Sequence, residues 1–134
     1  TLTPSLAMKD GKPFLAFAVQ GGDTQDQNLL QFLLNMVEFG MTVQQATEAA
    51  NINTNQLWLS LGGNKLEDRK PKPGNILLSD RTPESTRERL KKMGYKISTD
   101  DRTSGPINAI FFDWKHGSLW GGSSNHGEDY GIGW

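Results

Sequence analysis

Large and small apolar positions dominate the first twenty residues and predict a hairpin of two strands. Two apolar stretches flank Lys9-Asp10-Gly11-Lys12, and Asp-Gly is a strong hairpin signal because glycine accepts a positive φ without steric cost. In the second stretch large and small apolar residues alternate, so neither face is polar. The pattern predicts strands at Ser5–Met8 and Phe14–Val19, in a sheet that is covered on both faces.

Residues 23–50 follow a different period, with apolar positions every three or four residues, as in amphipathic helices. Asp23 or Thr24 is expected to cap the first helix, and Gly40 is expected to end it in a left-handed conformation. Thr42 and Gln45 form the sequence pattern of a capping box for the second helix. The short link between them predicts a helical hairpin that lies across one sheet face.

The remaining pattern predicts shorter elements. Leu57-Trp58-Leu59 is consistent with a short strand or with a buried loop, and the charged, proline-containing stretch 66–74 indicates an exposed connection. A helix is expected to start with a cap at Thr82-Pro83-Glu84 and to end at Met93-Gly94. Further strands are predicted at 75–78, 95–98, 107–114 and 118–120. This order favours an α+β fold with an antiparallel sheet, in one domain spanning 1–134.

Composition narrows the class of protein. The chain has 134 residues, 35% of them hydrophobic, which is enough for one domain with a core. Its net charge of −1 favours neither nucleic acid nor a membrane surface as a partner. The absence of cysteine excludes disulfides, thiolate metal sites and a cysteine nucleophile. No apolar run approaches the roughly 20 residues of a membrane span, and both cytoplasm and periplasm remain compatible.

The sharpest candidate for chemistry is Gln20-Gly21-Gly22-Asp23, between a predicted strand and a predicted helix. Two consecutive glycines leave their backbone N–H groups accessible, and the start of a helix favours negative charge. This is the outline of an oxyanion site, although the same pair fits a tight turn in which glycine only supplies unusual dihedral angles. No Ser-His-Asp set, paired carboxylates or cofactor fingerprint accompanies it, so the chain alone carries no complete active site.

Other residues with functional side chains favour structural roles. His116 falls in a predicted hairpin turn and is expected to be exposed. Segment 126–129 offers groups that a hard metal could use, but polar residues are expected in a glycine-rich tail, so neither a metal nor a cofactor is predicted. The aromatic residues expected to serve as core residues or chain-terminal anchors are Trp114, Trp120 and Trp134.

Several short motifs follow one another with a specific order and spacing. They are Thr1-Leu2-Thr3-Pro4-Ser5, Lys9-Asp10-Gly11-Lys12-Pro13, Gly21-Gly22, Asn35-Met36-Val37-Glu38-Phe39-Gly40-Met41, Met93-Gly94-Tyr95 and Gly131-Ile132-Gly133-Trp134. Taken together, they resemble the C-terminal part of the small subunit of gamma-glutamyltransferases, also called gamma-glutamyltranspeptidases. The resemblance covers nearly the whole chain.

This resemblance implies part of an N-terminal-nucleophile hydrolase, a four-layer αββα sandwich with mostly antiparallel sheets. Such a proenzyme cleaves itself, and the freed threonine attacks a small-molecule amide to form an acyl-threonine intermediate, its own α-amine serving as base. The family's Thr-Thr-His-like nucleophile motif does not occur in this sequence. The expected partners are therefore the large subunit and the N-terminal part of the small subunit of the same proenzyme.

Site residues follow from the resemblance position by position. Gly21 and Gly22 match the glycine pair whose N–H groups hold the oxyanion of the tetrahedral intermediate. Thr1 matches the second of two serines that bind the substrate's α-carboxylate. Asp23 stands where the family has a small hydroxyl residue, which places a carboxylate on the substrate-binding side and leaves the preference for a gamma-glutamyl group open.

Two further departures concern the anchoring of the chain. Ala50-Asn51-Ile52 stands where the family commonly has Ala-Pro-Arg, and Ser124-Asn125-His126 stands where it has Asp-Pro-Arg. Charge pairs that would tie the tail to the core are expected to be lost.

Three other hypotheses remain. The chain could belong to an amidohydrolase for another amide, such as oxamate or a cephalosporin side chain. It could be a non-catalytic binding or structural module that keeps the scaffold and a glycine-lined pocket. In the third hypothesis Thr1 is itself a free N-terminal nucleophile, but the resemblance places it on the substrate-binding side.

Overall fold

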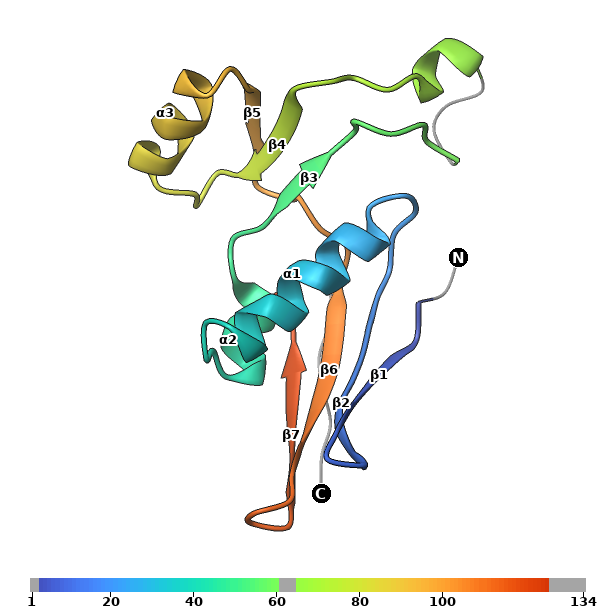
Figure 1. Ribbon diagram of the computed structural model, residues 1–134, viewed down its shortest axis with the longest axis vertical. Coiled ribbons are helices and arrows are strands. Elements are labelled where there is room, and N and C mark those ends of the chain that lie inside the picture. The colour runs from blue at the N-terminus through green and yellow to red at the C-terminus, as the bar shows by residue number, and fades with distance from the viewer. Residues whose placement is uncertain (1–2, 61–64, 126–134) are drawn as a thin grey trace.

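The computed structural model describes residues 3–60 and 65–125. Within them the chain forms a four-stranded sheet and a three-stranded sheet, with helices against each (Figure 1). The strands are β1 (Ser5–Lys9), β2 (Lys12–Val19), β3 (Ile52–Thr54), β4 (Asn75–Ser79), β5 (Lys96–Asp100), β6 (Ile107–Asp113) and β7 (Ser118–Ser123). The α-helices are α1 (Gln25–Val37), α2 (Val43–Glu48) and α3 (Glu84–Lys92), and a short 3-10 helix, η1, spans Leu66–Arg69.

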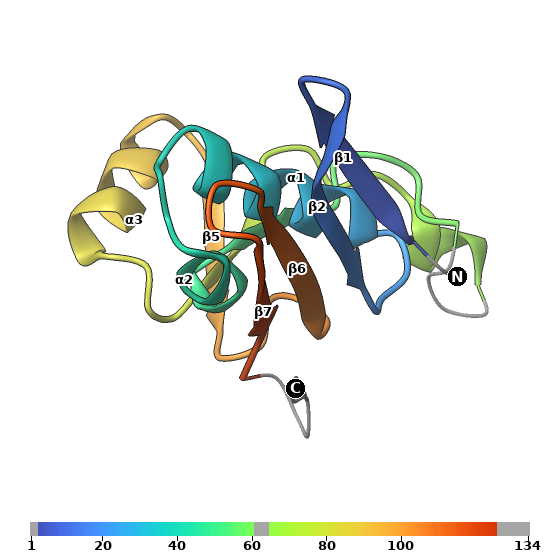
Figure 2. The ribbon, with the colours of Figure 1, turned by 90° about the horizontal axis from the view of Figure 1, so that it is seen from below.

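The larger sheet is antiparallel throughout and has the strand order β1-β2-β6-β7, which Figure 2 shows from below. Its first hairpin turns at Asp10 and Gly11, which have φ values of 51° and 74°. Positive φ at both turn residues matches the right-handed twist of the two strands. The hairpin predicted from the Asp-Gly pair is therefore confirmed.

Helices α1 and α2 pack against one face of the larger sheet. Their contact with β2 and β6 forms the main core, which comprises Val19, Leu29, Phe32, Val43, Ala46, Ile107 and Ala109. Gly40, at φ 64°, turns the chain between the two helices. The side chain of Thr42 and that of Gln45 form the predicted capping box at the start of α2. The helical hairpin expected from the sequence is confirmed.

The other face of the larger sheet is not covered by any described part of the chain. Strand register places Leu6, Ile110 and Leu119 on that face, and they are 58%, 43% and 66% exposed. The expectation that the hairpin is buried on both faces is therefore wrong for this chain by itself. The reason is that α1 and α2 both pack on the same side of the sheet.

The smaller sheet has the order β3-β4-β5 and departs from the predicted antiparallel pattern. Strands β3 and β4 are antiparallel, but β4 and β5 are parallel because α3 connects them as a crossover. Helix α3 has Pro83 in the N-cap position, so Thr82 does not cap it as expected. The fold remains α+β and mostly antiparallel.

Three glutamine side chains connect the helices to strand edges. The Gln27 amide donates to Thr54 O and accepts from Thr54 N, at 3.0 and 2.8 Å. Gln31 exchanges the same pair of bonds with Ile52, both at 2.7 Å, and Gln44 of α2 does so with Ser123 of β7. Each amide thus acts as one residue of a neighbouring strand, which satisfies the exposed edges of β3 and β7.

Two expectations about apolar residues are wrong. Leu57 and Trp58 lie in a loop and are 80% and 60% exposed, so segment 57–59 is neither a strand nor a buried loop. Trp114 and Trp120 are 57% and 52% exposed and are not core residues. The core needs neither of them, because α1 and α2 already cover the adjacent sheet face with aliphatic and phenylalanine side chains.

Candidate functional site

The candidate site lies where β2 ends and the chain turns into α1. Two side chains hold the last strand carbonyl, since the Thr3 hydroxyl and the Gln25 amide both donate to Val19 O, at 3.0 and 2.9 Å. Gln25 is buried, at 4% exposure. A carbonyl with two donors is fixed in direction, so the strand ends in a defined place immediately before the glycine pair.

Gly21 and Gly22 form the turn itself. Gly21 is exposed and has a φ of 156°, a value that residues with a side chain rarely adopt. The Gly22 carbonyl accepts from Gln25 N at 3.2 Å, which leads the chain into the first turn of α1. The Gly22 N–H donates to no acceptor among the residues that the structure describes. A backbone donor at the positive end of a helix is thus available to an anionic ligand.

Asp23 lies beside this turn, one residue before the N-cap of α1. Thr24 holds the N-cap position and its side chain makes no capping hydrogen bond, so the expected cap by Thr24 is wrong. The Asp23 carboxylate accepts a hydrogen bond from the Ser60 hydroxyl, in the loop that follows β3. This contact brings the 55–60 loop next to the glycine turn.

The structure therefore places three of the four predicted site residues together. Gly21, Gly22 and Asp23 are consecutive and lie at one end of β2, as the sequence requires. Thr1 falls outside the described residues, as do the tail segment 126–129 and Trp134. His116 is exposed in the β6–β7 turn, as expected, and lies at the other end of the sheet from the glycine pair.

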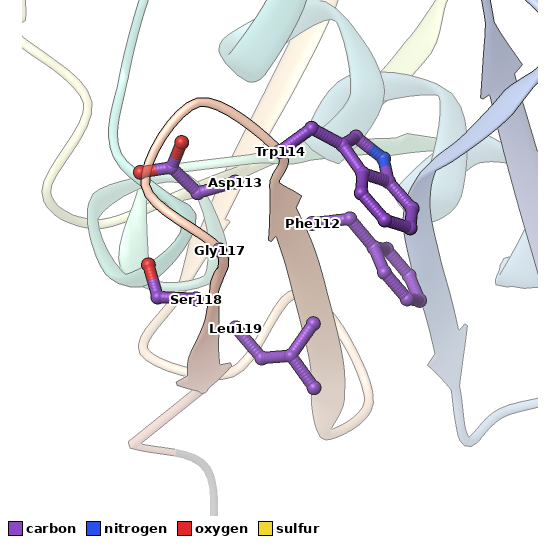
Figure 3. A pocket seen from close by; sticks show the side chains of 6 residues that line it. All are labelled: Phe112, Asp113, Trp114, Gly117, Ser118 and Leu119. Carbon is purple, nitrogen blue, oxygen red and sulfur yellow. The ribbon is translucent and has the colours of Figure 1, made fainter.

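A small hollow of about 130 Å³ lies at that other end (Figure 3). It is lined by Phe112, Asp113, Trp114, Gly117, Ser118 and Leu119. The imidazole of His116 is 2.7 Å from the Asp113 carboxylate, and this hydrogen bond lowers the pKa of Asp113. The lining offers neither a nucleophile beside a base nor a set of oxyanion donors, so the glycine turn remains the better candidate for chemistry.

The described residues contain neither a metal-binding cluster nor a helix that could span a membrane. Across residues 3–60 and 65–125 no group of three or more histidine, aspartate or glutamate side chains could hold a metal ion. None of the helices in the described part of the chain is long and apolar enough to cross a membrane.

Ser124, which stands where the family has an aspartate, makes hydrogen bonds between uncharged groups with the first residue of β6. The Ser124 hydroxyl accepts from Ile107 N at 3.1 Å, and Ser124 N donates to Ile107 O at 2.9 Å. Ser124 is 4% exposed, so this junction lies in the interior. Ser124 is therefore attached to the start of β6 by hydrogen bonds between uncharged groups. The sequence alone gave no signal for this role, because a serine after a strand is usually a surface residue.

Comparisons with known proteins assign the chain to a family. The family model of gamma-glutamyltranspeptidase matches residues 1–134. The chain is 31% identical to a glutathione hydrolase proenzyme of Bacillus subtilis (strain 168), over 98% of the chain and 20% of that protein. It is 28% identical to the acylase ACY 1 proenzyme of Pseudomonas sp. (strain V22), over 84% of the chain and 17% of that protein. The chain thus spans about a fifth of the length of the curated relatives it matches.

Solved structures show the same fold. A gamma-glutamyltranspeptidase from Pseudomonas nitroreducens, complexed with L-DON, superposes with a TM-score of 0.74 at 22% identity, over 98% of this chain and 61% of that one. A cephalosporin acylase from Bacillus halodurans superposes with a TM-score of 0.70 at 24% identity, over 88% of this chain and 19% of that one. These likenesses confirm an α+β fold of the N-terminal-nucleophile hydrolase class. Because the family model matches the full length of the sequence, the chain belongs to the gamma-glutamyltranspeptidase family.

Proposed function

We propose that residues 1–134 form part of an N-terminal-nucleophile amidohydrolase or acyltransferase and supply its oxyanion site through Gly21 and Gly22. The observation that carries this proposal is the turn at the end of β2, where the Gly22 N–H has no partner among the described residues. The turn leads directly into α1, whose helix dipole adds to the attraction for a negative oxygen. The threonine nucleophile lies outside this chain.

In the proposed reaction, the threonine hydroxyl attacks the carbonyl carbon of an amide, and the carbonyl oxygen becomes an oxyanion. The N–H groups of Gly21 and Gly22 donate to that oxygen, which carries a full charge only in the transition state and intermediate. The α-amine of that threonine takes the hydroxyl proton during attack and passes it to the leaving nitrogen. Collapse of the intermediate then breaks the C–N bond, releases the amine and leaves an acyl-threonine. Water or an amine then takes the acyl group and restores the hydroxyl.

The acyl group is an open part of the proposal. The curated relatives include a glutathione hydrolase and an acylase, so gamma-glutamyl and other acyl groups are both candidates. Asp23 and Ser60 lie beside the turn and are hydrogen-bonded to each other. In this proposal they form a polar pair next to the amide substrate. Thr1 is proposed to bind a substrate carboxylate, as the family resemblance implies.

The partners are proposed from the exposed face of the larger sheet. Leu6, Ile110 and Leu119 together leave an apolar surface that a soluble chain would bury. The relatives are named as proenzymes, and a second sheet from the same proenzyme is the proposed cover. Such a cover completes the four layers of an αββα sandwich.

The oxyanion role is tested by Gly22→Ala in the full-length protein, with glutathione and an acylated cephalosporin as substrates. A Cβ beside the donor crowds the oxyanion position, and we expect kcat to fall about 10²- to 10³-fold while KM changes little. Ser85→Ala is the control, because Ser85 is exposed on α3, which contacts β5 of the smaller sheet. If the Gly22 variant melts at a lower temperature than the parent but turns over at the parental rate, Gly22 only shapes the turn and the proposal fails.

A further inference from the structure

The connection between β5 and β6 lies directly against the residue before the glycine pair. The Gln20 N–H donates to Pro106 O at 3.1 Å. On its other side, a Cβ built on Gly105 would overlap the Gln20 carbonyl oxygen and stand 2.6 Å from the carbonyl carbon. Gly105 has no positive φ, so it is the close approach of two backbones, and not a turn, that requires glycine here.

The close contact at Gly105 affects the direction of the Gly21 N–H, the first of the two proposed oxyanion donors. The Gln20 carbonyl and the Gly21 N–H belong to one planar trans peptide, since the described chain contains no cis peptide bond. In such a unit the N–H points opposite to the carbonyl. The backbone that packs on the Gln20 carbonyl therefore also fixes the direction in which the Gly21 N–H points.

The β5–β6 connection is itself fixed by side-chain hydrogen bonds to Thr103. The Thr103 hydroxyl donates to the Asn51 side-chain carbonyl, and the Asn53 amide donates to Thr103 O. The Asn51 amide then donates to the Asn28 side chain of α1, at 3.1 Å. Asn28, Asn53 and Thr103 are 1%, 7% and 6% exposed. These bonds join β3 and the residue before it, the β5–β6 connection and α1.

This hydrogen-bond network leaves buried polar atoms unpaired, which lowers the free energy of unfolding. The cost argues that the network positions the backbone rather than stabilises the fold. The Asn28 amide nitrogen and the Asn53 side-chain oxygen are buried and have no hydrogen-bond partner in the described chain. Each such group costs about 1–3 kcal/mol, whereas an apolar filling of the same space would cost nothing of this kind. Hydrogen bonds, unlike apolar contacts, fix the direction of the backbone that they hold.

We propose that Gly105 is a positioning residue, and that the segment Thr103–Pro106 sets the direction of the Gly21 N–H and thereby the rate of the chemical step. This inference rests on the proposed function, because it assumes that the Gly21 N–H is a donor to the oxyanion. Gly105 touches neither substrate nor reacting atoms. It acts through the peptide that joins Gln20 to Gly21.

The test uses Gly105→Ala, Thr103→Val and Thr103→Ser in the full-length protein, with Ser85→Ala, at an exposed position of α3, as the control. We expect Gly105→Ala to lower kcat about 10²-fold with KM within about two-fold of the parent, since a misplacement near 1 Å costs that much. Thr103→Val removes the hydroxyl donor and should lower kcat by a smaller factor. Thr103→Ser keeps that donor and should restore the parental kcat. Hydrogen exchange of the peptide covering 20–25 should accelerate in the first two variants only.

The outcomes separate this inference from the function on which it rests. A Gly105→Ala protein with parental kcat overturns the positioning role, while a slow Gly22→Ala protein still supports the oxyanion site. Where Gly105→Ala does not fold, equal kcat for the two Thr103 variants overturns the proposal. Hydrogen exchange needs no turnover, so unchanged exchange across 20–25 in both Gly105→Ala and Thr103→Val overturns it even for a protein without amidase activity.

Discussion

The glutamine bridges between α1 and β3 make a sharp prediction for the substitution Gln31→Glu. The Gln31 amide donates to Ile52 O and accepts from Ile52 N, both at 2.7 Å. A carboxylate retains the second bond but has no proton for the first. It instead sets a charged oxygen against the Ile52 carbonyl oxygen, so β3 should separate more readily from α1.

The magnitude follows from the bonds that change. The substitution loses the bonds from the amide to Ile52 O and to Gln27 O, the latter at 2.9 Å and within one helix. An average hydrogen bond contributes about 0.5–1.5 kcal/mol, and the stronger bond from Ile52 N to a charged acceptor offsets part of the loss. We expect the opening of β3 to become easier by about 1–2 kcal/mol, a factor of about 5–30 in the exchange of its amides.

Acidification should reverse the effect. The Ile52 carbonyl favours the protonated carboxyl, so the pKa of the introduced group is raised in the folded protein. A raised pKa contributes stability that is fully present below the unfolded value of about 4.3 and is lost as the pH rises through the folded value. The difference from the parent at the same pH should therefore shrink as the pH falls toward 4.

The assay is hydrogen exchange of residues 52–54 in the full-length protein, as a function of pH. Gln45→Glu is the matched control, because the Gln45 side-chain oxygen only accepts, from Thr42 N at 3.0 Å and from the Thr42 hydroxyl at 3.1 Å. The same change there should be neutral or stabilising by a few tenths of a kcal/mol, since a carboxylate at a helix start is favourable. Equal and pH-independent effects at positions 31 and 45 would refute the argument.

Two further predictions concern other parts of the fold. Gly122→Ala should destabilise the contact of α2 with β7 by about 1–3 kcal/mol, because its Cβ would stand 2.9 Å from the Val43 backbone. Gly121→Ala should be nearly neutral, because a Cβ there meets no atom within 4 Å. Thermal unfolding of both variants checks this difference. His116→Ala should raise the pKa of Asp113 toward its ordinary value, which a carboxyl NMR titration would detect. Because the hydrogen bond lowers that pKa, its stabilising effect is present above the unfolded value and is lost as the pH falls through the folded one. A titration curve identical in parent and variant would show that the hydrogen bond does not exist in solution.

The fold was largely predictable because its signals are local. The Asp10-Gly11 turn, the Thr42 capping box and the left-handed Gly40 each depend on a few neighbouring residues, and each forms as expected. The parallel pairing of β4 with β5 was not predictable in the same way. It depends on which strands meet after α3, and the apolar pattern of a short strand does not encode its partner.

Burial was the least predictable property, because it depends on what else covers a surface. The alternating residues of β2 and the tryptophans at 114 and 120 are of types common in protein cores, yet residues 3–60 and 65–125 cover only one face of the larger sheet. A strand pattern that is apolar on both faces fits a sheet that is covered on both sides. In the proposed assembly a second sheet supplies that cover, and the apolar pattern then describes the proposed assembly rather than this chain by itself.

For the candidate site, the sequence located the glycine pair but not what orients it. Gly21 and Gly22 form a visible motif, whereas Gly105 lies about eighty residues away in a stretch with an ordinary turn composition. Nothing in Ser104-Gly105-Pro106 distinguishes a glycine that makes a turn from one that permits two backbones to touch. That distinction needs the distance from its Cβ position to Gln20.

The two departures from the family pattern meet at this same place. Asn51 stands where the family commonly has proline, next to Ile52 at the arginine position, and it accepts a hydrogen bond from Thr103. Ser124, where an aspartate is common, accepts a hydrogen bond from Ile107 N. Thr103 and Ile107 bracket the segment that packs on Gln20. Removing one member of a charge pair leaves a buried charge that costs several kcal/mol, but replacing charged groups by neutral ones that bond elsewhere avoids this cost. The support of the glycine turn therefore depends on neutral hydrogen bonds here, and its geometry should not change with the ionisation of any side chain in the network.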